Sequence, residues 1–254
     1  MADGVNEVTL LGQNVNSYGK NLEEKITFAE LLRMVHEVEG IERIHFTTSH
    51  PKDMSDDLIA CYRDLPKLAN YLHLPVQSGS NRVLKMMNRH YTREDYFALI
   101  DKVRAVRPDI SLSTDIMVGF PGETEEDFED TLDLVKRVQY DNAFTFIYSR
   151  REGTRADKME NQVPKDVKDA RFQRLLDAVY AIQREKYEAL HGTVQEVLFE
   201  SVSKNDPTKM SGRTAGFKLV HAPYDEASIG KMVPVKITGG NTFSLEGEIV
   251  HGKQ

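Results

Sequence analysis

Residues 113–128 read STDIMVGFPGETEEDF, and their hydrophobic period changes in the middle. The apolar run at 112–118 contains β-branched residues and predicts a strand. The Gly-Phe-Pro-Gly segment at 119–122 predicts a turn that breaks it. Thr124 followed by Asp127 resembles a capping box, and apolar residues then continue at helical spacing. The stretch therefore predicts a strand, a turn and a helix in succession.

One polar residue, Asp115, interrupts this apolar strand and shares a strand face with Ser113 and Met117. A buried carboxylate is costly unless it is paired or accepts hydrogen bonds. In parallel βα barrels, residues near the C-terminal ends of strands are typical site residues. Asp115 therefore either lines a site or binds neighbouring backbone, and the strand alone leaves both interpretations open.

The same alternation of strand and helix recurs along the first two thirds of the chain. Strands are expected to begin near residues 7, 43, 71, 111 and 143. Spacings of roughly thirty residues indicate parallel βα units. On three strands one face is apolar, and the other carries His45, Ser49, His73, Gln77 and Asp115. We expect an α/β fold with an open or incomplete barrel, because five units are too few for a closed eightfold one.

The pattern changes after a long predicted helix at 166–190. Short alternating runs separated by turn signals predict a small all-β domain of the OB-like barrel type. We therefore divide the chain into a βα domain, residues 1–190, and a β domain, residues 191–254. The β domain has seven basic and seven acidic residues, so the net charge of −7 lies in the first domain. Bulk electrostatic attraction to nucleic acid is thus disfavoured, although a local basic patch is not.

The composition bounds the class of protein. The 254 residues are 40% hydrophobic and 29% charged, which is ordinary for a globular protein. We expect no membrane span, because no apolar run reaches about eighteen residues, and residues 1–7 lack the features of a signal peptide. The single cysteine, Cys61, excludes an internal disulfide and suits a reducing cytoplasm. It lies among apolar residues of a predicted helix, so we expect a buried structural thiol.

Five motifs follow one another along the chain: LGQNVNSYG at 11–19, TTSHP at 47–51, LPVQSGS at 74–80, MNR at 87–89 and GFPGET at 119–124. Together, in this order, they resemble the motifs of the radical S-adenosylmethionine (SAM) methylthiotransferases. The β domain resembles the TRAM domain that ends those proteins. The resemblance implies a partial (βα) barrel of the radical SAM type that lacks its first strand, followed by the TRAM barrel. A ribosomal-protein branch shares both domains, but the loop at 12–19 resembles the tRNA branch better.

The resemblance implies an activity, cofactors and a partner. Such enzymes methylthiolate C2 of N6-(dimethylallyl)adenosine next to the anticodon, using SAM and [4Fe–4S] clusters. A reduced cluster splits SAM, and the resulting radical removes the hydrogen from C2. The expected partner is therefore tRNA that carries this nucleoside, and the expected location is the cytoplasm.

The chain departs from the family in its cysteines. Members carry a Cys-x3-Cys-x2-Cys loop after the first barrel strand and further cysteines in an N-terminal domain, and each cluster needs three thiolates. Here Cys61 stands alone. We therefore assign no metal ligand and no catalytic residue, and expect the N-terminal part of the same protein to be missing. The alternative is an inactive fragment that binds tRNA or SAM and catalyses nothing.

The resemblance also assigns candidate contacts to SAM. The candidates are Gln13, Asn14, Ser49, Gln77, Arg89 and Asp115. Gln77 and Arg89 match positions that hold the amino-acid part of SAM, and the fixed charge of Arg suits a carboxylate. Asp115 matches the acid that binds the ribose hydroxyls. Without the family, Gln77 is equally a turn-capping amide and Arg89 a solvated helix end.

Four cations of the β domain are candidate contacts to the tRNA backbone. They are Lys204, Arg213, Lys218 and Lys236. We expect them to gather on one face of the barrel and to bind phosphates by releasing counterions. The alternative is that they are ordinary solvated surface. Phe217 either stacks on an exposed base or is buried in the barrel.

The cysteine count makes a first testable prediction. Anaerobic reconstitution of this 254-residue chain with iron and sulfide is expected to give no stoichiometric [4Fe–4S] cluster, because one thiolate cannot hold it. Iron and sulfide analysis is the measurement. A stoichiometric cluster that cleaves SAM would contradict the prediction.

Overall fold

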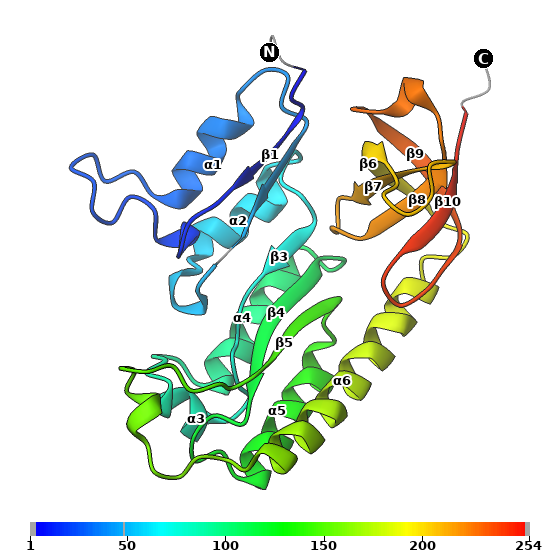
Figure 1. Ribbon diagram of the computed structural model, residues 1–254. Coiled ribbons are helices and arrows are strands. Elements are labelled where there is room, and N and C mark those ends of the chain that lie inside the picture. The colour runs from blue at the N-terminus through cyan, green and yellow to red at the C-terminus, as the bar shows by residue number, and fades with distance from the viewer. Residues whose placement is uncertain (1–3, 48, 252–254) are drawn as a thin grey trace.

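Figure 1 shows the computed structural model of the chain, which describes residues 4–47 and 49–251. The βα part comes first, and its long last helix leads to a separate small β-barrel. Thr48 of the TTSHP motif lies outside the described residues. Within the described ranges, no helix is long and apolar enough to cross a membrane.

The βα part alternates strands and helices as the sequence predicts. Its strands are β1 (Glu7–Leu10), β2 (Arg43–Phe46), β3 (Tyr71–His73), β4 (Ser111–Val118) and β5 (Asn142–Ile147). Its helices are α1 (Phe28–His36), α2 (Asp56–Asp64), α3 (Asn81–Met86), α4 (Arg93–Val106), α5 (Glu125–Val138) and α6 (Lys165–Glu188). Three-residue 3-10 turns lie at Val15–Ser17, Pro51–Asp53 and Ala156–Lys158. The predicted strand, turn and helix around residues 113–128 are therefore confirmed as β4 and α5.

The strands of the βα part pair in parallel, but in two sheets. One sheet holds β1 and β2, and the other has the order β3-β4-β5. An isolated bridge from Ile44 to Leu68 lies between them. Helices connect successive strands, as parallel pairing requires, and pack against the apolar side of the sheets (Figure 1). The two parallel sheets together form an incomplete barrel, which confirms the predicted fold class.

Local capping sets where the helices begin. Thr27, Thr92 and Thr124 each accept a hydrogen bond from the backbone N–H three residues on. The acidic side chain at that position accepts one from the threonine backbone in return, so all three helices begin with a capping box, and the one predicted at Thr124 is confirmed. Cys61 is fully buried in α2, and burial raises the pKa of its thiol, as expected of a structural cysteine.

The C-terminal part closes into a five-stranded barrel. Its strands are β6 (Val194–Val202), β7 (Lys209–Thr214), β8 (Leu219–Pro223), β9 (Met232–Gly240) and β10 (Leu245–Ile249), with a 3-10 turn at Glu226–Ser228. The order around the barrel is β10-β8-β7-β6-β9. Every second residue of β9 points inward, so Val235 and Ile237 are fully buried. The prediction of a small all-β barrel is therefore confirmed.

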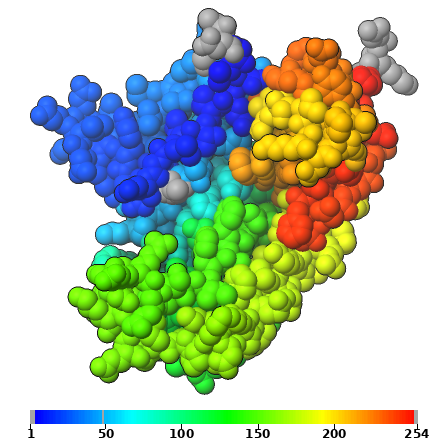
Figure 2. Space-filling view, in the orientation of Figure 1, coloured from blue at the N-terminus to red at the C-terminus, as the bar shows by residue number. Residues whose placement is uncertain are grey.

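A buried ion pair joins the two parts, which lie in contact in Figure 2. Lys218, in the turn between β7 and β8, donates to Asp141 at 2.6 Å and to Ser111 at 3.0 Å. Lys186 of α6 donates to the other Asp141 oxygen at 2.9 Å. Burial raises the pKa of Asp141, but the two ammonium groups lower it by more, so it lies below its usual value. The carboxylate therefore stays charged and holds the barrel to β4 and α6.

We predict that Asp141→Asn destabilises the joint strongly. It leaves the buried Lys218 ammonium without a countercharge, and breaking a buried pair in this way costs about 3–5 kcal/mol. Urea denaturation at pH 7 measures the loss. Because the pKa of Asp141 is lowered on folding, its contribution is present above about pH 4 and lost as the pH falls through the folded value.

The matched control is Lys209→Ala, which removes a solvent-exposed pair with Glu246. It should leave the denaturation midpoint unchanged, because exposed pairs contribute little. An Asp141→Asn protein as stable as the control would contradict the proposed role of the buried pair.

Candidate functional site

Polar side chains line the inner side of β3 and β4. The hydroxyl of Ser113 lies 2.6 Å from the Tyr71 hydroxyl and 2.8 Å from Nδ1 of His73. On the other side of the same ring, Nε2 of His73 lies 3.6 Å from a carboxylate oxygen of Asp115. The register places Leu72 beside Leu112 and His73 beside Ser113, which puts the polar residues of both strands on one face. This face is the predicted polar interior.

The Asp115 carboxyl combines partial burial with two basic neighbours, His73 and Arg89. Burial raises the pKa of Asp115, and the charges of His73 and Arg89 partly oppose that rise. Burial lowers the pKa of His73, so its ring tends to be neutral. The side chain of Asp115 is 28% exposed. The chemistry of this site is therefore that of a hydrogen-bond acceptor facing the open side of the barrel.

Gln77 and Arg89 line one cavity of about 260 Å³ at the C-terminal mouth of the strands. Met117, Phe120 and Met159 supply apolar walls to the same cavity. Asp115 is not among its lining residues, although the positive charge of Arg89 acts on its carboxylate. The structure thus brings two of the three principal candidates together and leaves the third beside them. Whether all three bind one ligand stays a prediction.

The backbone around Gln77 is held in an unusual conformation. Its φ is 71°, in the left-handed region that side chains other than glycine rarely adopt. Its N–H donates to Asp115 O at 2.8 Å, and its carbonyl accepts from the N–H of Met117 at 2.9 Å. These two bonds attach the strand end to β4. They hold Gln77 in place at the mouth despite the local strain.

Close packing fixes the turn and helix that follow. A Cβ added at Gly79 would lie 2.5 Å from both the Asp130 oxygen and the Thr131 Cα, so the backbone of α5 leaves room only for glycine. The N–H of Gly79 donates to the Thr131 hydroxyl at 3.0 Å. Helix α3 therefore starts directly against α5, and the turn after α3 presents Arg89.

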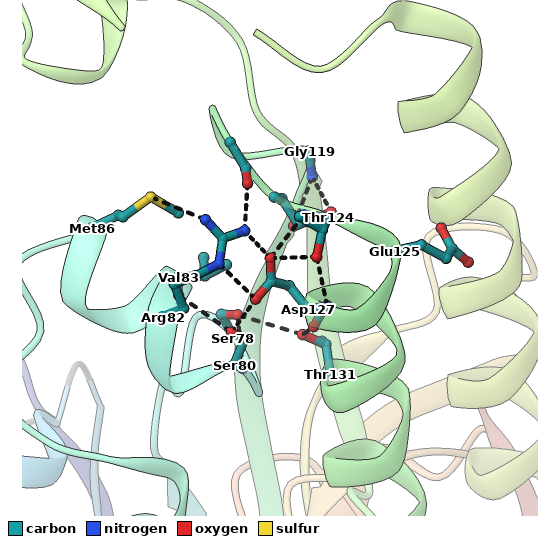
Figure 3. Close-up of polar contacts among 12 residues, drawn as sticks. Ser78, Ser80, Arg82, Val83, Met86, Gly119, Thr124, Glu125, Asp127 and Thr131 are labelled. Atoms are coloured by element: carbon teal, nitrogen blue, oxygen red, sulfur yellow. Dashed lines mark hydrogen bonds and ion pairs between the residues drawn. The ribbon is translucent and has the colours of Figure 1, made fainter. Parts of the chain in front are cut away.

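Asp127 of α5 organises this junction, as Figure 3 shows. It accepts hydrogen bonds from Ser80 at 2.6 Å and from the Thr124 N–H at 2.8 Å, and it forms an ion pair with Arg82. Burial raises the pKa of Asp127, but Arg82, Ser80 and Thr124 outweigh it and lower the value to about 2. The sequence identified Asp127 only as a helix cap. Its bonds to Ser80 and Arg82 were missed, because no local pattern signals them.

The remaining SAM candidates lie apart from the cavity. Gln13 and Asn14 are exposed in the loop after β1 and do not line it. Ser49 is buried, and its hydroxyl has no hydrogen-bond partner among the described residues. Their contact with SAM stays a prediction.

Two family models match the chain. Residues 1–135 match the model described as the radical SAM superfamily, and residues 188–250 match the TRAM domain. The chain belongs to the radical SAM superfamily.

This radical SAM protein is similar to relatives named tRNA-2-methylthio-N(6)-dimethylallyladenosine synthase. The relative from Clostridium botulinum (strain Okra / Type B1) is 56% identical over 248 residues, which cover 98% of this chain and 55% of the relative. That from Clostridium beijerinckii is 58% identical over 246 residues, covering 97% and 54%. The chain thus spans about half the length of the curated relatives it matches.

Among solved structures, the chain has a distant likeness to coproporphyrinogen III oxidase from Escherichia coli, a radical SAM enzyme. The two are 22% identical, with a TM-score of 0.47 over 63% of this chain and 37% of the other. This likeness is too distant to carry an argument.

The residues of this chain fit one of the two superfamily cofactors. An amide, a guanidinium and a nearby carboxylate at the barrel mouth suit the amino-acid part and hydroxyls of SAM. A cluster does not fit, since the one thiol is buried and its pKa is raised. Within the described ranges, no group of three His, Cys, Asp or Glu residues is placed to hold a metal ion.

The TRAM cations are placed differently from one another. Lys204 and Lys236 are exposed, and Arg213 is half-buried with its guanidinium 4.5 Å from the centre of the Phe217 ring. The expectation that Lys218 lies on the RNA-facing surface is wrong, because its ammonium is buried against Asp141. A carboxylate 77 residues away in sequence competes for that charge.

We predict that Asp127→Asn lowers the free energy of unfolding by about 2 kcal/mol at pH 7, through loss of charged hydrogen bonds. The folded pKa of about 2 lies below the ordinary value of 3.8, so the effect is full above about pH 4 and disappears as the pH falls through about 2. Urea denaturation between pH 2 and 7 measures it. Asp133→Asn on the same helix is the control, since its pair with Arg93 is exposed. Equal effects of both variants at pH 7 would contradict the prediction.

Proposed function

We propose that this chain forms the SAM-binding and RNA-binding part of an enzyme that methylthiolates C2 of N6-(dimethylallyl)adenosine next to the anticodon of tRNA. The observation that carries the proposal is the 56–58% identity to the named synthases, which extends through both domains. The polar inner face of the barrel supports it, because that face ends in a cavity suited to SAM.

Each residue at the mouth has a role under this proposal. Arg89 binds the carboxylate of SAM, and the Gln77 amide orients its amino-acid part. Asp115 accepts hydrogen bonds from the ribose hydroxyls. When bound to a reduced cluster, SAM supplies the one-electron chemistry that removes a hydrogen atom from an unactivated carbon. The apolar walls of the cavity exclude water from that chemistry.

The second candidate function is a binding module that catalyses nothing. The lone, buried Cys61 favours it for this polypeptide by itself, because no described residue replaces the missing cluster ligands. A ribosomal-protein methylthiotransferase is the third candidate, and it differs from the first in its substrate. Under the first proposal the chain works in the cytoplasm, where tRNA is modified.

A chimaera tests the proposal. This chain replaces the matching 248-residue segment of the Clostridium botulinum relative, so that the rest of the relative supplies its own N-terminal half. The chimaera is expressed in cells that lack the activity, and digested tRNA is analysed for 2-methylthio nucleosides by mass spectrometry. We expect the modification to be restored, since both domains keep their partners.

Substitutions at the mouth sharpen the test. Arg89→Ala and Asp115→Ala in the chimaera should each weaken SAM binding by about 1–3 kcal/mol, measured by equilibrium dialysis, through loss of charged hydrogen bonds. Arg107→Ala, at the end of α4 away from the cavity, is the control. Unmodified tRNA with a folded, cluster-loaded chimaera would refute the tRNA activity. Modified ribosomal protein in its place would support the other branch.

A further inference from the structure

A second cavity lies between the TRAM domain and the βα part, at the opposite end of the strands from Gln77. It has a volume of about 290 Å³, at the lower end of ligand pockets. Asn142, at the start of β5, and Tyr187, near the end of α6, line it from one side. TRAM turns line it from the other, where α6 runs up to the barrel in Figure 1.

The floor of this interdomain cavity carries an unused hydrogen-bond acceptor. Gln183 of α6 is 4% exposed, and its Oε1 has no partner among the described residues. Its amide N–H faces the Tyr187 hydroxyl, which leaves Oε1 as the free end. A buried acceptor without a donor is unfavourable. A ligand with an N–H group would satisfy it.

The charges around the interdomain cavity favour a negative ligand. Lys218 and Lys186 both bind the single carboxylate of Asp141, so one positive charge remains unbalanced. Arg213 adds another, since within the described part of the chain it forms no ion pair with a carboxylate. The guanidinium instead donates to the Phe217 carbonyl at 3.2 Å.

Three exposed aromatic rings line the same cavity, one of them Phe217 at 37% exposure. Phe144 of β5 is 47% exposed and Phe243, in the turn between β9 and β10, is 58% exposed. Phe243 meets Tyr180 in a T-shaped arrangement, with the ring centroids 5.3 Å apart. Exposed apolar rings gathered beside one cavity are suited to bind a flat, apolar surface.

We propose that this interdomain cavity binds a nucleobase of single-stranded RNA. A base offers a flat face to stack on Phe243, an N–H donor for Gln183 and a phosphate for Arg213. The inference rests on the proposed function, which makes RNA the substrate, and adds a base contact remote from the SAM cavity. Under this inference, residues at the contact between the two domains bind the RNA.

The probe is a fluorescein-labelled decamer of riboadenylate, titrated with the whole chain and followed by fluorescence anisotropy. Phe243→Ala should weaken binding 5-fold or more, because loss of one base–aromatic stack costs about 1–3 kcal/mol. Gln183→Met, which keeps the volume and removes the acceptor, should weaken it about 3- to 10-fold. Melting curves of both variants show that each is folded.

Tyr224→Ala is the matched control, because Tyr224 is an exposed aromatic of the same domain that does not line the cavity. If both Phe243→Ala and Gln183→Met bind the decamer as tightly as Tyr224→Ala does, the cavity does not bind a base, and the proposed function still stands. Failure of the wild-type chain to bind any RNA, including transcribed tRNA, would overturn the cavity together with the RNA part of the proposed function. Adenosine monophosphate bound as tightly as the decamer would show a free-nucleotide site and overturn the RNA assignment.

Discussion

The carboxylate of Asp141 is the constraint on which the arrangement of the two domains depends. A buried carboxylate requires countercharges, and here they come from α6 and from a TRAM turn. Lys218 also donates to Ser111 at the start of β4, so one ammonium group touches the sheet and the joint at once. The TRAM domain is therefore attached to the βα part by these contacts as well as by its covalent link to α6. Its turn packs against the N-terminal end of the open barrel.

The rest of that turn packs in the same place. The Phe217 ring stacks on Tyr71 at 4.9 Å and meets His45 edge to face at 5.3 Å. Arg43 of β2 donates to the Arg213 carbonyl at 3.1 Å. A single hairpin thus contacts β2 and β3, which belong to different sheets. These two sheets share only an isolated bridge among the described residues, so the TRAM turn helps to hold them together. The opposite, C-terminal end of the strands carries the cavity lined by Gln77 and Arg89.

Much of the fold could be predicted from sequence because its signals are local. The strand-turn-helix at 113–128 and the three capping boxes depend on residues within a few positions of each other. The Lys218–Asp141 pair spans 77 residues and the Arg82–Asp127 bond spans 45, so no window of sequence contains both partners. The charged residues of the TRAM domain are limited in the same way. Their equal numbers predict a net charge of zero for the domain, but they do not predict that Lys218 is the lysine that is buried.

The candidate site was predictable to a similar extent. Family motifs identified Gln77 and Arg89, and the structure places both on one cavity. What holds them there was not visible in the motifs: the left-handed backbone at Gln77 and the contact of Gly79 with α5 appear only when two helices and a strand meet. Gln183 is a comparable case, since a glutamine on a long helix has no signal that marks it as buried.

The charge balance bears on how such a chain would hold RNA. Phosphate contacts provide affinity by releasing counterions, and each contact adds about 0.7–0.9 to the salt slope. The TRAM domain has equal numbers of acidic and basic residues, and the structure commits Lys218 to Asp141 and pairs Lys209 with Glu246. Two of its seven cations are therefore engaged with carboxylates instead of being free for phosphates. Under the proposed function, a neutral domain of this kind would add stacking and hydrogen bonds to bases to the affinity that its phosphate contacts provide, and only the phosphate contacts would set the salt slope.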